Sequence, residues 1–262
     1  MKKKLLAICG AVVLSVSLLA GCVGKNDKEG TNTLGIIGAM EEEVEILKEK
    51  MDIKETVEIA GMEFYTGKIH DKDVVLVRSG VGKVNMATCT QILVDKFNAS
   101  AVVNSGVAGT MDPALNQGDI VISTDAVQHD FDTTVFGDPL GEISRLGITF
   151  FEADEKLREV AKNAAKNISG LRIKEGRIAS GDQFVAGGPV ADRIKSNFGE
   201  VSAVEMEGAA MAQVAHLNKI PFVILRSISD KADGTADMSY EEFLPIAAKN
   251  ASSLLDEFIK LY

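Results

Sequence analysis

The sequence predicts an α/β fold: one three-layer domain in which helices cover both faces of a twisted, mostly parallel but mixed sheet. Short apolar runs alternate along the chain with longer segments whose apolar residues recur at helical spacing. Several runs, such as "FVILRSI", are apolar at successive positions, which is typical of strands buried on both faces. With 262 residues, 46% of them hydrophobic, the chain is long enough for one sizeable core.

The first half of the predicted domain starts at residue 33. A helix over residues 41–51 is indicated by Val44, Leu47 and Met51, which recur at helical spacing. The other elements expected here are strands at 33–39, 62–69, 73–80 and 101–106, with a helix from Val84 to Phe97. The residues that follow the last of these strands, within "NSGVAGT", are expected to form a turn of small residues.

The second half continues the alternation after an irregular stretch from His129 to about Thr149. The expected strands are 119–127, 172–181, 202–206 and 220–230. The expected helices are 152–168, 188–198, 207–219 and 239–261, and Pro189 marks the first turn of the second one.

The N-terminus has the pattern of a bacterial lipoprotein signal. Three lysines, Lys2 to Lys4, precede an uncharged apolar run that ends in Leu19-Ala20-Gly21-Cys22, which resembles a lipobox. We therefore predict a signal peptide over 1–21, a lipidated polar tether over 22–32 and the folded domain over 33–262. The expected location is the extracytoplasmic face of a bacterial membrane, with Cys22 as the lipid-bearing residue. An uncleaved anchor or an ordinary signal peptide is the alternative, although the apolar run is short for a membrane span.

Charge and cysteine content narrow the class of partner. Removal of residues 1–21 deletes three lysines and no acids, so the formal charge falls from −10 to −13. Such an acidic domain argues against nucleic-acid binding, which requires a basic surface. Cys89 is the one cysteine left after cleavage and lipidation, and its amphipathic surroundings favour a small buried hydrophobe.

Polar residues gather where the predicted apolar strands end. In open α/β sheets, ligands bind beyond the carboxyl ends of the strands. Taken singly, these residues have simpler explanations, such as helix-dipole partners, caps or core residues. Five strand ends carrying polar groups together favour a site; their residues include Glu41 to Glu43, Asp182, Phe184, Val185, Glu205, Met206, Glu207, Arg226, Ser229 and Asp230.

Six of these stretches together carry a family resemblance. In order they are "GIIGAMEEEV", "SGVGKVNMA", "NSGVAG", "ASGDQF", "AVEMEGAA" and "RSISDKAD". The chain resembles the 5′-methylthioadenosine/S-adenosylhomocysteine nucleosidases of the purine nucleoside phosphorylase superfamily from about residue 33 to its C-terminus. The resemblance implies the nucleoside phosphorylase-like fold and hydrolysis of the N-glycosidic bond of 5′-substituted adenosines, releasing adenine.

The resemblance also implies a role for each matching residue. Glu43 would activate the attacking water, Asp230 would serve N7 of adenine with Ser229 positioning it, and Glu207 would hold the ribose hydroxyls. The residues that would line the substrate are Phe184 and Val185 at the base, Met206 at the sugar, Glu205, Arg226 and Val107 in the wall, and Tyr240 near the 5′ tail. The segment "DFDTTVFG", with Phe136, matches the part that completes a partner subunit's pocket, so a homodimer is implied.

Elementary chemistry accounts for these residue types independently. Adenine leaves readily only when its N7 receives a proton, and the ribosyl cation left behind is stabilised by carboxylates. A second acid must stay ionised to take a proton from water, and Glu43 lies near a helix N-terminus that favours the charged form. This chemistry requires no cofactor and no metal, and His70, His129 and His216 lack ligand spacing.

Three functions stay open at this point. A purine nucleoside phosphorylase or broader nucleosidase would bind phosphate, which the glutamates at 41–43 would repel. A nucleoside-binding lipoprotein without catalysis would have the same fold, although Glu43, Glu207 and Asp230 are all present. We expect a hydrolase; Val107, where relatives often have serine, leaves the preferred 5′ substituent open.

Overall fold

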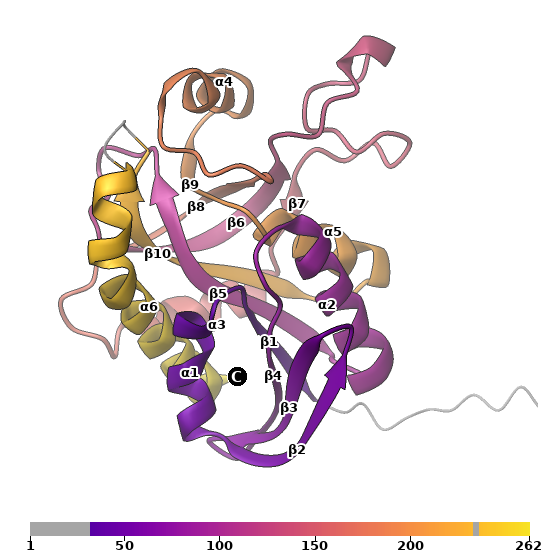
Figure 1. The fold of residues 1–262 in the computed structure, drawn as a ribbon, viewed down its shortest axis with the longest axis vertical. Helices are drawn as coiled ribbons and strands as arrows, with labels where there is room; N and C mark the ends of the chain where they lie inside the picture. The colour runs from indigo at the N-terminus through magenta and orange to yellow at the C-terminus, as the bar shows by residue number, and fades with distance from the viewer. Residues whose placement is uncertain (1–31, 233–235) are drawn as a thin grey trace, which may run out of the picture. The chain divides into compact units, whose positions relative to one another are not determined.

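The computed structural model describes residues 32–232 and 236–262. The predicted signal peptide and the tether up to residue 31, including Cys22, lie outside the described residues. The α/β fold is confirmed: helices flank both faces of a mixed sheet (Figure 1). No helix in the part of the chain that the structure describes is long and apolar enough to cross a membrane.

The strands follow the expected order with two additions. They are β1 (Leu34–Gly38), β2 (Asp52–Ile59), β3 (Met62–Ile69), β4 (Lys72–Arg78), β5 (Ala101–Thr110), β6 (Ile120–Gln128), β7 (Phe151–Glu152), β8 (Ile173–Ser180), β9 (Val201–Glu205) and β10 (Phe222–Lys231).

The helices also match the predicted series. They are α1 (Glu41–Lys50), α2 (Lys83–Phe97), the 3₁₀ turn η1 (Thr134–Phe136), α3 (Glu155–Ala165), α4 (Gly188–Phe198), α5 (Gly208–Asn218) and α6 (Ala236–Leu261).

The sheet consists of two groups of parallel strands that are joined to each other by antiparallel pairings. Strands β4, β1, β5 and β10 run parallel to one another, and so do β6, β8 and β9. The groups are antiparallel to each other and meet twice, where β10 pairs with β6 and where Gly109 of β5 pairs with Val204 of β9. The pairings β10–β6–β8–β9–β5–β10 therefore close into a ring, and β3 and β2 extend the sheet beyond β4.

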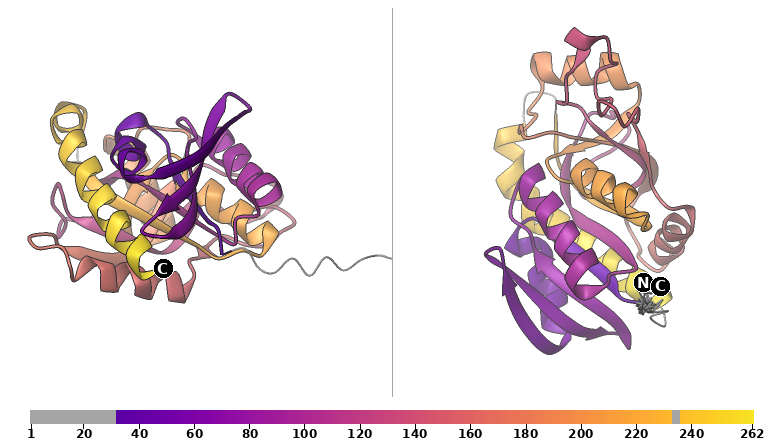
Figure 2. Two further views of the ribbon diagram at one scale, coloured as in Figure 1. Left: turned by 90° about the horizontal axis from the view of Figure 1, so that it is seen from below. Right: turned by 90° about the vertical axis from the view of Figure 1, so that its right-hand side faces the viewer.

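Two hydrophobic layers hold the helices on the sheet. On one face, α2 and α5 lie side by side and contribute Met86, Cys89, Leu93 and Met211 to the larger buried cluster (Figure 2). On the other face, α1, α3 and α6 pack against the strands; their buried residues include Val44, Leu47, Leu157, Leu254 and Phe258. Cys89 is buried, as predicted, and burial raises the pKa of its thiol.

Two local predictions are wrong. The expected turn in "NSGVAGT" is strand, because β5 continues to Thr110 by pairing with β10 along its whole length. Strand β2 was not anticipated because it lies at the sheet edge, where its polar sequence "DIKETVEI" is mostly exposed. Charged residues on an edge strand discourage pairing with other chains, so they weaken the alternation that identifies a strand.

Candidate active site

The main candidate site is a cavity at the place where the two strand groups meet. Ten of the twelve residues predicted to contribute to the substrate site line it: Glu43, Val107, Phe184, Val185, Glu205, Met206, Glu207, Ser229, Asp230 and Tyr240. The remaining lining residues are Ala39, Met40, Val81, Ala108, Gly109, Gln183 and Val204. The carboxyl ends of β1, β5, β9 and β10 thus face one space.

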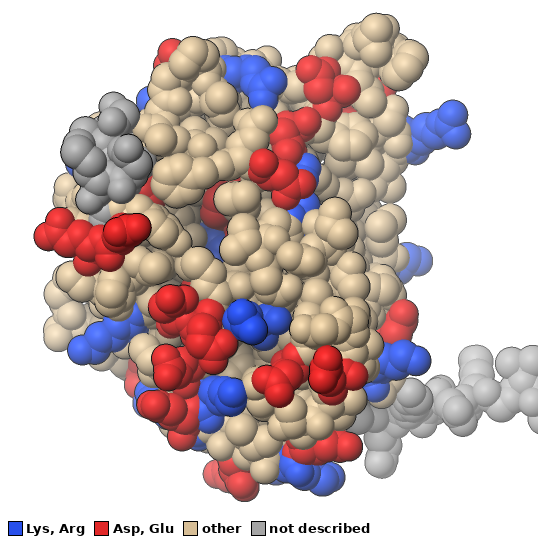
Figure 3. Space-filling model, viewed as in Figure 1, with Lys and Arg blue, Asp and Glu red and all other residues tan. Residues whose placement is uncertain are grey.

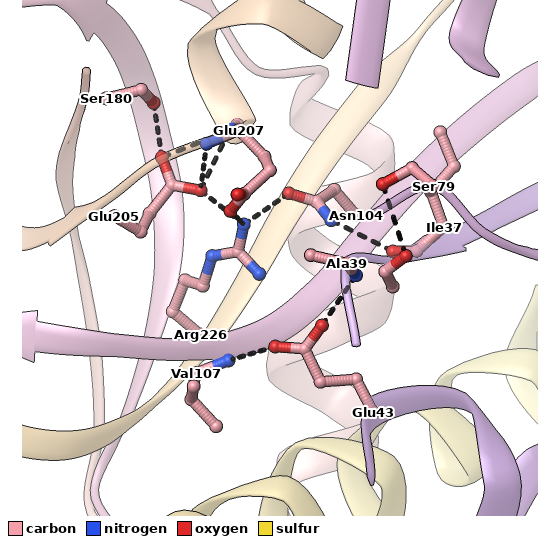
Figure 4. A network of polar contacts seen from close by, with 12 residues as sticks. Ile37, Ala39, Glu43, Ser79, Asn104, Val107, Ser180, Glu205, Glu207 and Arg226 are labelled. Atoms are coloured by element: carbon pink, nitrogen blue, oxygen red, sulfur yellow. Dashed lines mark hydrogen bonds and ion pairs between the residues drawn. The ribbon is translucent and has the colours of Figure 1, made fainter. Parts of the chain in front are cut away.

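Glu43 is held by backbone N–H groups on two sides. It is the third residue of α1, and its side chain folds back so that Oε2 accepts from the N–H groups of Ala39 (2.6 Å) and Met40 (3.0 Å). Its Oε1 accepts from the N–H of Val107 on β5 (3.0 Å) (Figure 4). The carboxylate therefore joins the start of α1 to the central strand.

Burial dominates the electrostatics of Glu43. The side chain is almost fully buried, which raises the pKa of the carboxyl although Arg226 and the three backbone donors oppose the shift. The sequence predicts that the helix N-terminus keeps this acid ionised. In the structure, burial outweighs that effect and raises the pKa of the carboxyl.

Arg226 is the only cation in this part of the described chain that contacts the buried acids. It is 1% exposed, and its Nη2 donates to Glu205 and to Asn104 Oδ1 (2.5 Å). Asn104 in turn donates to the carbonyl of Ile37 (2.9 Å). Although burial opposes it, the charges of Glu205, Glu43 and Glu207 hold the pKa of Arg226 above its ordinary value. Arg226 therefore lies behind the cavity wall as a charge partner.

Glu205 is saturated with hydrogen bonds. Besides Arg226, it accepts from the hydroxyl of Ser180 and from the N–H groups of Glu207 (3.1 Å) and Gly208 (2.8 and 3.0 Å). These bonds bind the end of β9 to the first turn of α5 (Figure 4). Glu205 thus positions the chain on either side of Glu207.

Glu207 has fewer partners than Glu205. Its Oε1 accepts from the N–H of Gly82 (2.8 Å), and its Oε2 lies 3.6 Å from Nη2 of Arg226. Burial, then the neighbouring charge of Glu205, raise the pKa of Glu207 to about 7. The partner Gly82 has φ +98°, which favours glycine. Its motif "SGVGKVNMA" was recognised in the sequence, but its backbone contact was not.

Gly106 brings Glu43 and Arg226 close together. A Cβ at this position would lie 2.3 Å from both Glu43 Oε1 and Arg226 Nη1. Nη1 and Nε of Arg226 have no hydrogen-bond partner among the described residues. A buried donor without a partner lies beside the carboxylate of Glu43, which is a place suited to a polar ligand or water.

Asp230 lies at the end of β10 on the other side of the cavity. It is 2% exposed and accepts from the hydroxyl of Ser229 (2.8 Å). A Cβ on Gly109 would lie 2.8 Å from its Oδ1, so the small residue makes room for the carboxyl group.

Two aromatic residues, Phe184 and Tyr240, line the cavity on the side that faces solvent. Phe184 is 54% exposed, and its ring meets the ring of Tyr240 edge to face with centroids 5.7 Å apart. The Tyr240 hydroxyl donates to the sulfur of Met40 (3.4 Å), and burial raises the pKa of Tyr240 to about 12. A partly exposed ring above a cavity is available for stacking on a planar ligand.

Three predicted or considered residues lie elsewhere. Phe136 does not line the cavity of its own chain; it is 82% exposed in the 3₁₀ turn at the tip of a projecting arm, the small pink helix in Figure 1. Glu41 and Glu42 are exposed, and Glu41 pairs with Arg78 (3.2 Å). Of the three consecutive glutamates, only Glu43 enters the site.

On the face drawn in Figure 3, acidic and basic side chains of the described residues are interspersed. The acids of the cavity are thus distinguished from those of this surface by burial, which is what shifts their pKa values.

Comparison with known proteins identifies the family. The sequence profile of the phosphorylase superfamily matches residues 33–260. A 5′-methylthioadenosine/S-adenosylhomocysteine nucleosidase of Psychromonas ingrahamii is 48% identical over 226 residues, which cover 86% of this chain and 97% of that protein. The chain belongs to the phosphorylase superfamily, in its 5′-methylthioadenosine/S-adenosylhomocysteine nucleosidase family.

Solved structures of similar proteins share the fold of this chain. The Neisseria meningitidis nucleosidase, in complex with methylthio-immucillin-A, has a TM-score of 0.85 and 41% identity, covering 87% of this chain and 99% of that one. The futalosine hydrolase of Helicobacter pylori strain 26695 has a TM-score of 0.82 and 36% identity, covering 87% and 97%. The solved structures that are similar to this chain therefore include enzymes named for different nucleosides.

The raised pKa of Glu207 predicts a pH-dependent stability. Between the ordinary value of 4.5 and about 7, the folded protein keeps a proton that the unfolded chain has released. The stabilising contribution of this group is therefore complete below pH 4.5 and is lost as the pH rises through 7. We expect Glu207→Gln to be more stable than the wild type at alkaline pH, by up to about 3 kcal/mol in the free energy of unfolding. It should therefore unfold at a higher temperature there, with little difference under acid conditions.

Thermal melts of both proteins across this pH range measure the effect. Glu42→Gln is the matched control, because Glu42 is an exposed glutamate in the first turn of α1. Parallel stability curves for wild type and Glu207→Gln would contradict the assignment of the shift to Glu207.

Proposed function

We propose that this chain hydrolyses the N-glycosidic bond of 5′-methylthioadenosine, S-adenosylhomocysteine and related 5′-substituted adenosines. The products are adenine and the 5′-substituted ribose. The observation that carries the proposal is one cavity that brings together three buried carboxyl groups, Glu43, Glu207 and Asp230, with an exposed aromatic ring at its mouth.

The three acids have separate roles in this proposal. Asp230 gives a proton to N7 as the bond between C1′ and N9 breaks, and the bonding electron pair leaves with the base. Glu43 takes a proton from the water whose oxygen forms the new bond to C1′. Glu207 accepts hydrogen bonds from the ribose hydroxyls, and the carboxylates together stabilise the positive charge that develops on the sugar.

The position of Arg226 supports water as the nucleophile. No lysine or arginine is among the described residues that line the cavity. Among the described residues, the cation in contact with these acids is Arg226, which is paired with Glu205 and also lies near Glu43 and Glu207. One positive charge among several carboxyl groups leaves an incoming phosphate facing an excess of negative charge. The partnerless Nη1 beside Glu43 can instead hold a neutral water.

The 5′ substituent is assigned to an apolar corner of the cavity. Val107 packs there against Ala247 and Ala248, with Met40 and Tyr240 beside them. Such a wall favours the thioether part of a 5′ substituent. The likeness to a futalosine hydrolase is a reason to include more than one 5′ group in the assay.

A substrate panel tests the proposed reaction. The soluble domain, from about residue 25, is incubated with methylthioadenosine, S-adenosylhomocysteine, 5′-deoxyadenosine and adenosine, each with and without phosphate. We expect adenine and free 5′-substituted ribose at rates that phosphate does not change. Stimulation by phosphate with formation of a ribose 1-phosphate would indicate a phosphorylase, and adenine release from none of the four would refute the enzyme assignment.

Conservative changes to the two proton-transfer residues should abolish most of the turnover. Asp230→Asn removes the proton donor and Glu43→Gln removes the base, so each should lower kcat by at least ~10². The exposed Glu42→Gln, one residue away from Glu43, should retain wild-type kcat. A near-normal rate in either Asp230→Asn or Glu43→Gln would remove the role assigned to that residue.

We also propose that the domain acts as a homodimer in which Phe136 completes the partner's cavity. Val135 and Phe136 are 84% and 82% exposed on the projecting arm, which is unusual for adjacent large apolar residues.

Phe136→Ala should weaken activity, and so should Asp230→Asn. Equal mixtures of the two impaired variants should recover about a quarter of wild-type activity. Half of the dimers are then mixed, and one of the two sites in each mixed dimer contains both native residues. Mixtures with no more activity than their components would exclude a shared site.

The membrane anchor is proposed on the sequence pattern at Cys22. The described chain begins at Asn32, whose side chain accepts from the Tyr262 hydroxyl (3.2 Å) beside the amino end of β1. The cavity lies at the other, carboxyl end of β1. Lipid labelling of the full chain in bacterial cells should be lost in Cys22→Ala, and labelling that persists would refute the lipidation site.

A further inference from the structure

A polar network lies next to the cavity without lining it. Its members are Lys83 at the start of α2, Asp130 at the end of β6 and Asp182 in the loop after β8. We infer that this network is a positioning element that holds the ribose and adenine halves of the site in register. The inference rests on the proposed function and assigns these three residues a part in it.

The contacts form a closed chain across three segments distant in sequence. Lys83 Nζ donates to Asp130 Oδ1 (2.5 Å) and to Gln128 Oε1 (3.1 Å). Asp130 Oδ2 accepts from the N–H of Asp182 (2.9 Å). Asp182 Oδ1 then accepts from the N–H of Lys83 (2.8 Å). Each member therefore contacts the other two.

Asp182 takes the place of a missing helix cap. The residue before α2 is Gly82, which has no side chain to satisfy the first N–H groups of the helix. The Asp182 carboxylate accepts from the first of them and contributes a negative charge at the N-terminus, which the helix dipole favours. A loop 99 residues further along the chain thus orders the start of α2.

This connection reaches both halves of the proposed site. Gly82, adjacent to Lys83, donates its N–H to Glu207 Oε1, the group assigned to the ribose hydroxyls. Asp182 is followed directly by Gln183, Phe184 and Val185, which line the cavity at the base position. A shift of Lys83 would therefore move a donor of Glu207, and a shift of Asp182 would move the base-binding loop.

The ion pair is sheltered enough to be specific. The side chains of Lys83 and Asp130 are each 16% exposed. Although burial opposes it, the hydrogen bonds from Lys83 and from the Asp182 N–H hold the pKa of Asp130 below its ordinary value. Loss of either partner would leave a charge with little access to water, so the geometry depends on both.

Kinetics of Lys83 variants test the inference. Lys83→Met should lower kcat/KM for methylthioadenosine by about tenfold to a hundredfold, since small misplacements of binding groups cost this much. It should also move the acid limb of the kcat/KM profile to higher pH, because a displaced start of α2 weakens the hydrogen bond from the Gly82 N–H to Glu207 while its charged neighbours Glu205, Arg226 and Glu43 remain. Lys83→Arg, which keeps the positive charge, should retain most activity and the wild-type profile.

Two further pairs separate positioning from folding. Asp182→Asn keeps an acceptor for the Lys83 N–H and should be milder than Asp182→Ala. Lys96→Met, at the exposed end of the same helix, should behave as wild type. Rates are expressed per folded molecule from melting curves, so that simple destabilisation does not lower them.

The outcomes distinguish this inference from the proposed function. A wild type that releases no adenine refutes the proposed function. An active wild type, with Lys83→Met unchanged in kcat/KM and in pH profile, refutes only the positioning role. A Lys83→Met rate that is normal per folded molecule also refutes it, because the network would then support stability alone.

Discussion

One buried guanidinium group organises the centre of this protein. Arg226 is almost without solvent contact and lies among three carboxyl groups, to one of which it is directly hydrogen-bonded. A single cation cannot neutralise three acids equally. Glu205 receives the close ion pair and the N–H donors of α5, whereas burial raises the pKa values of Glu43 and Glu207. The unequal division leaves two acids with raised pKa values in one cavity, which suits acid–base chemistry.

Small residues on β5 make this arrangement sterically possible. Side chains at positions 106 and 109 would collide with Arg226, Glu43 and Asp230, so glycine at both lets charged groups from α1 and β10 approach the central strand. The same strand supplies the Val107 N–H to Glu43. Strand β5 is therefore both a central strand of the sheet and one wall of the cavity. The stability of the fold and the geometry of the acids depend on the same backbone.

The energetic cost of such a site is a reason to interpret it functionally. Burying carboxyl groups without full compensation destabilises a fold, and well-packed apolar residues would serve stability as well or better. The proposed hydrolysis of an N-glycosidic bond gives these acids a role. The network around Lys83 is a second set of partly buried charges. Its ion pair connects the two loops to which we assign the ribose and base contacts.

Local pattern was enough to predict most elements. The helices α1, α2 and α4 agree closely with their predicted bounds, because their apolar spacing and initiation signals are contained within each segment. Strand β2 and the strand character of 107–110 could not be predicted in this way. The first is an exposed edge strand, and the second is strand because β10 pairs with it from far along the chain.

The sequence by itself determined the class of fold, the order of its elements and the residue types of the site, since these are written in periodicity and in short motifs. Only the tertiary structure decided how the acids meet. The strand groups β1–β5–β10 and β6–β8–β9 run in opposite directions. The carboxyl ends of β5 and β9 share a cavity only because the sheet closes on itself and pairs Gly109 with Val204. Likewise, nothing local to Gly82 or Asp182 reveals that one donates to Glu207 and the other caps α2. These contacts join segments that are far apart in sequence, and their existence depends on the packing of the whole domain.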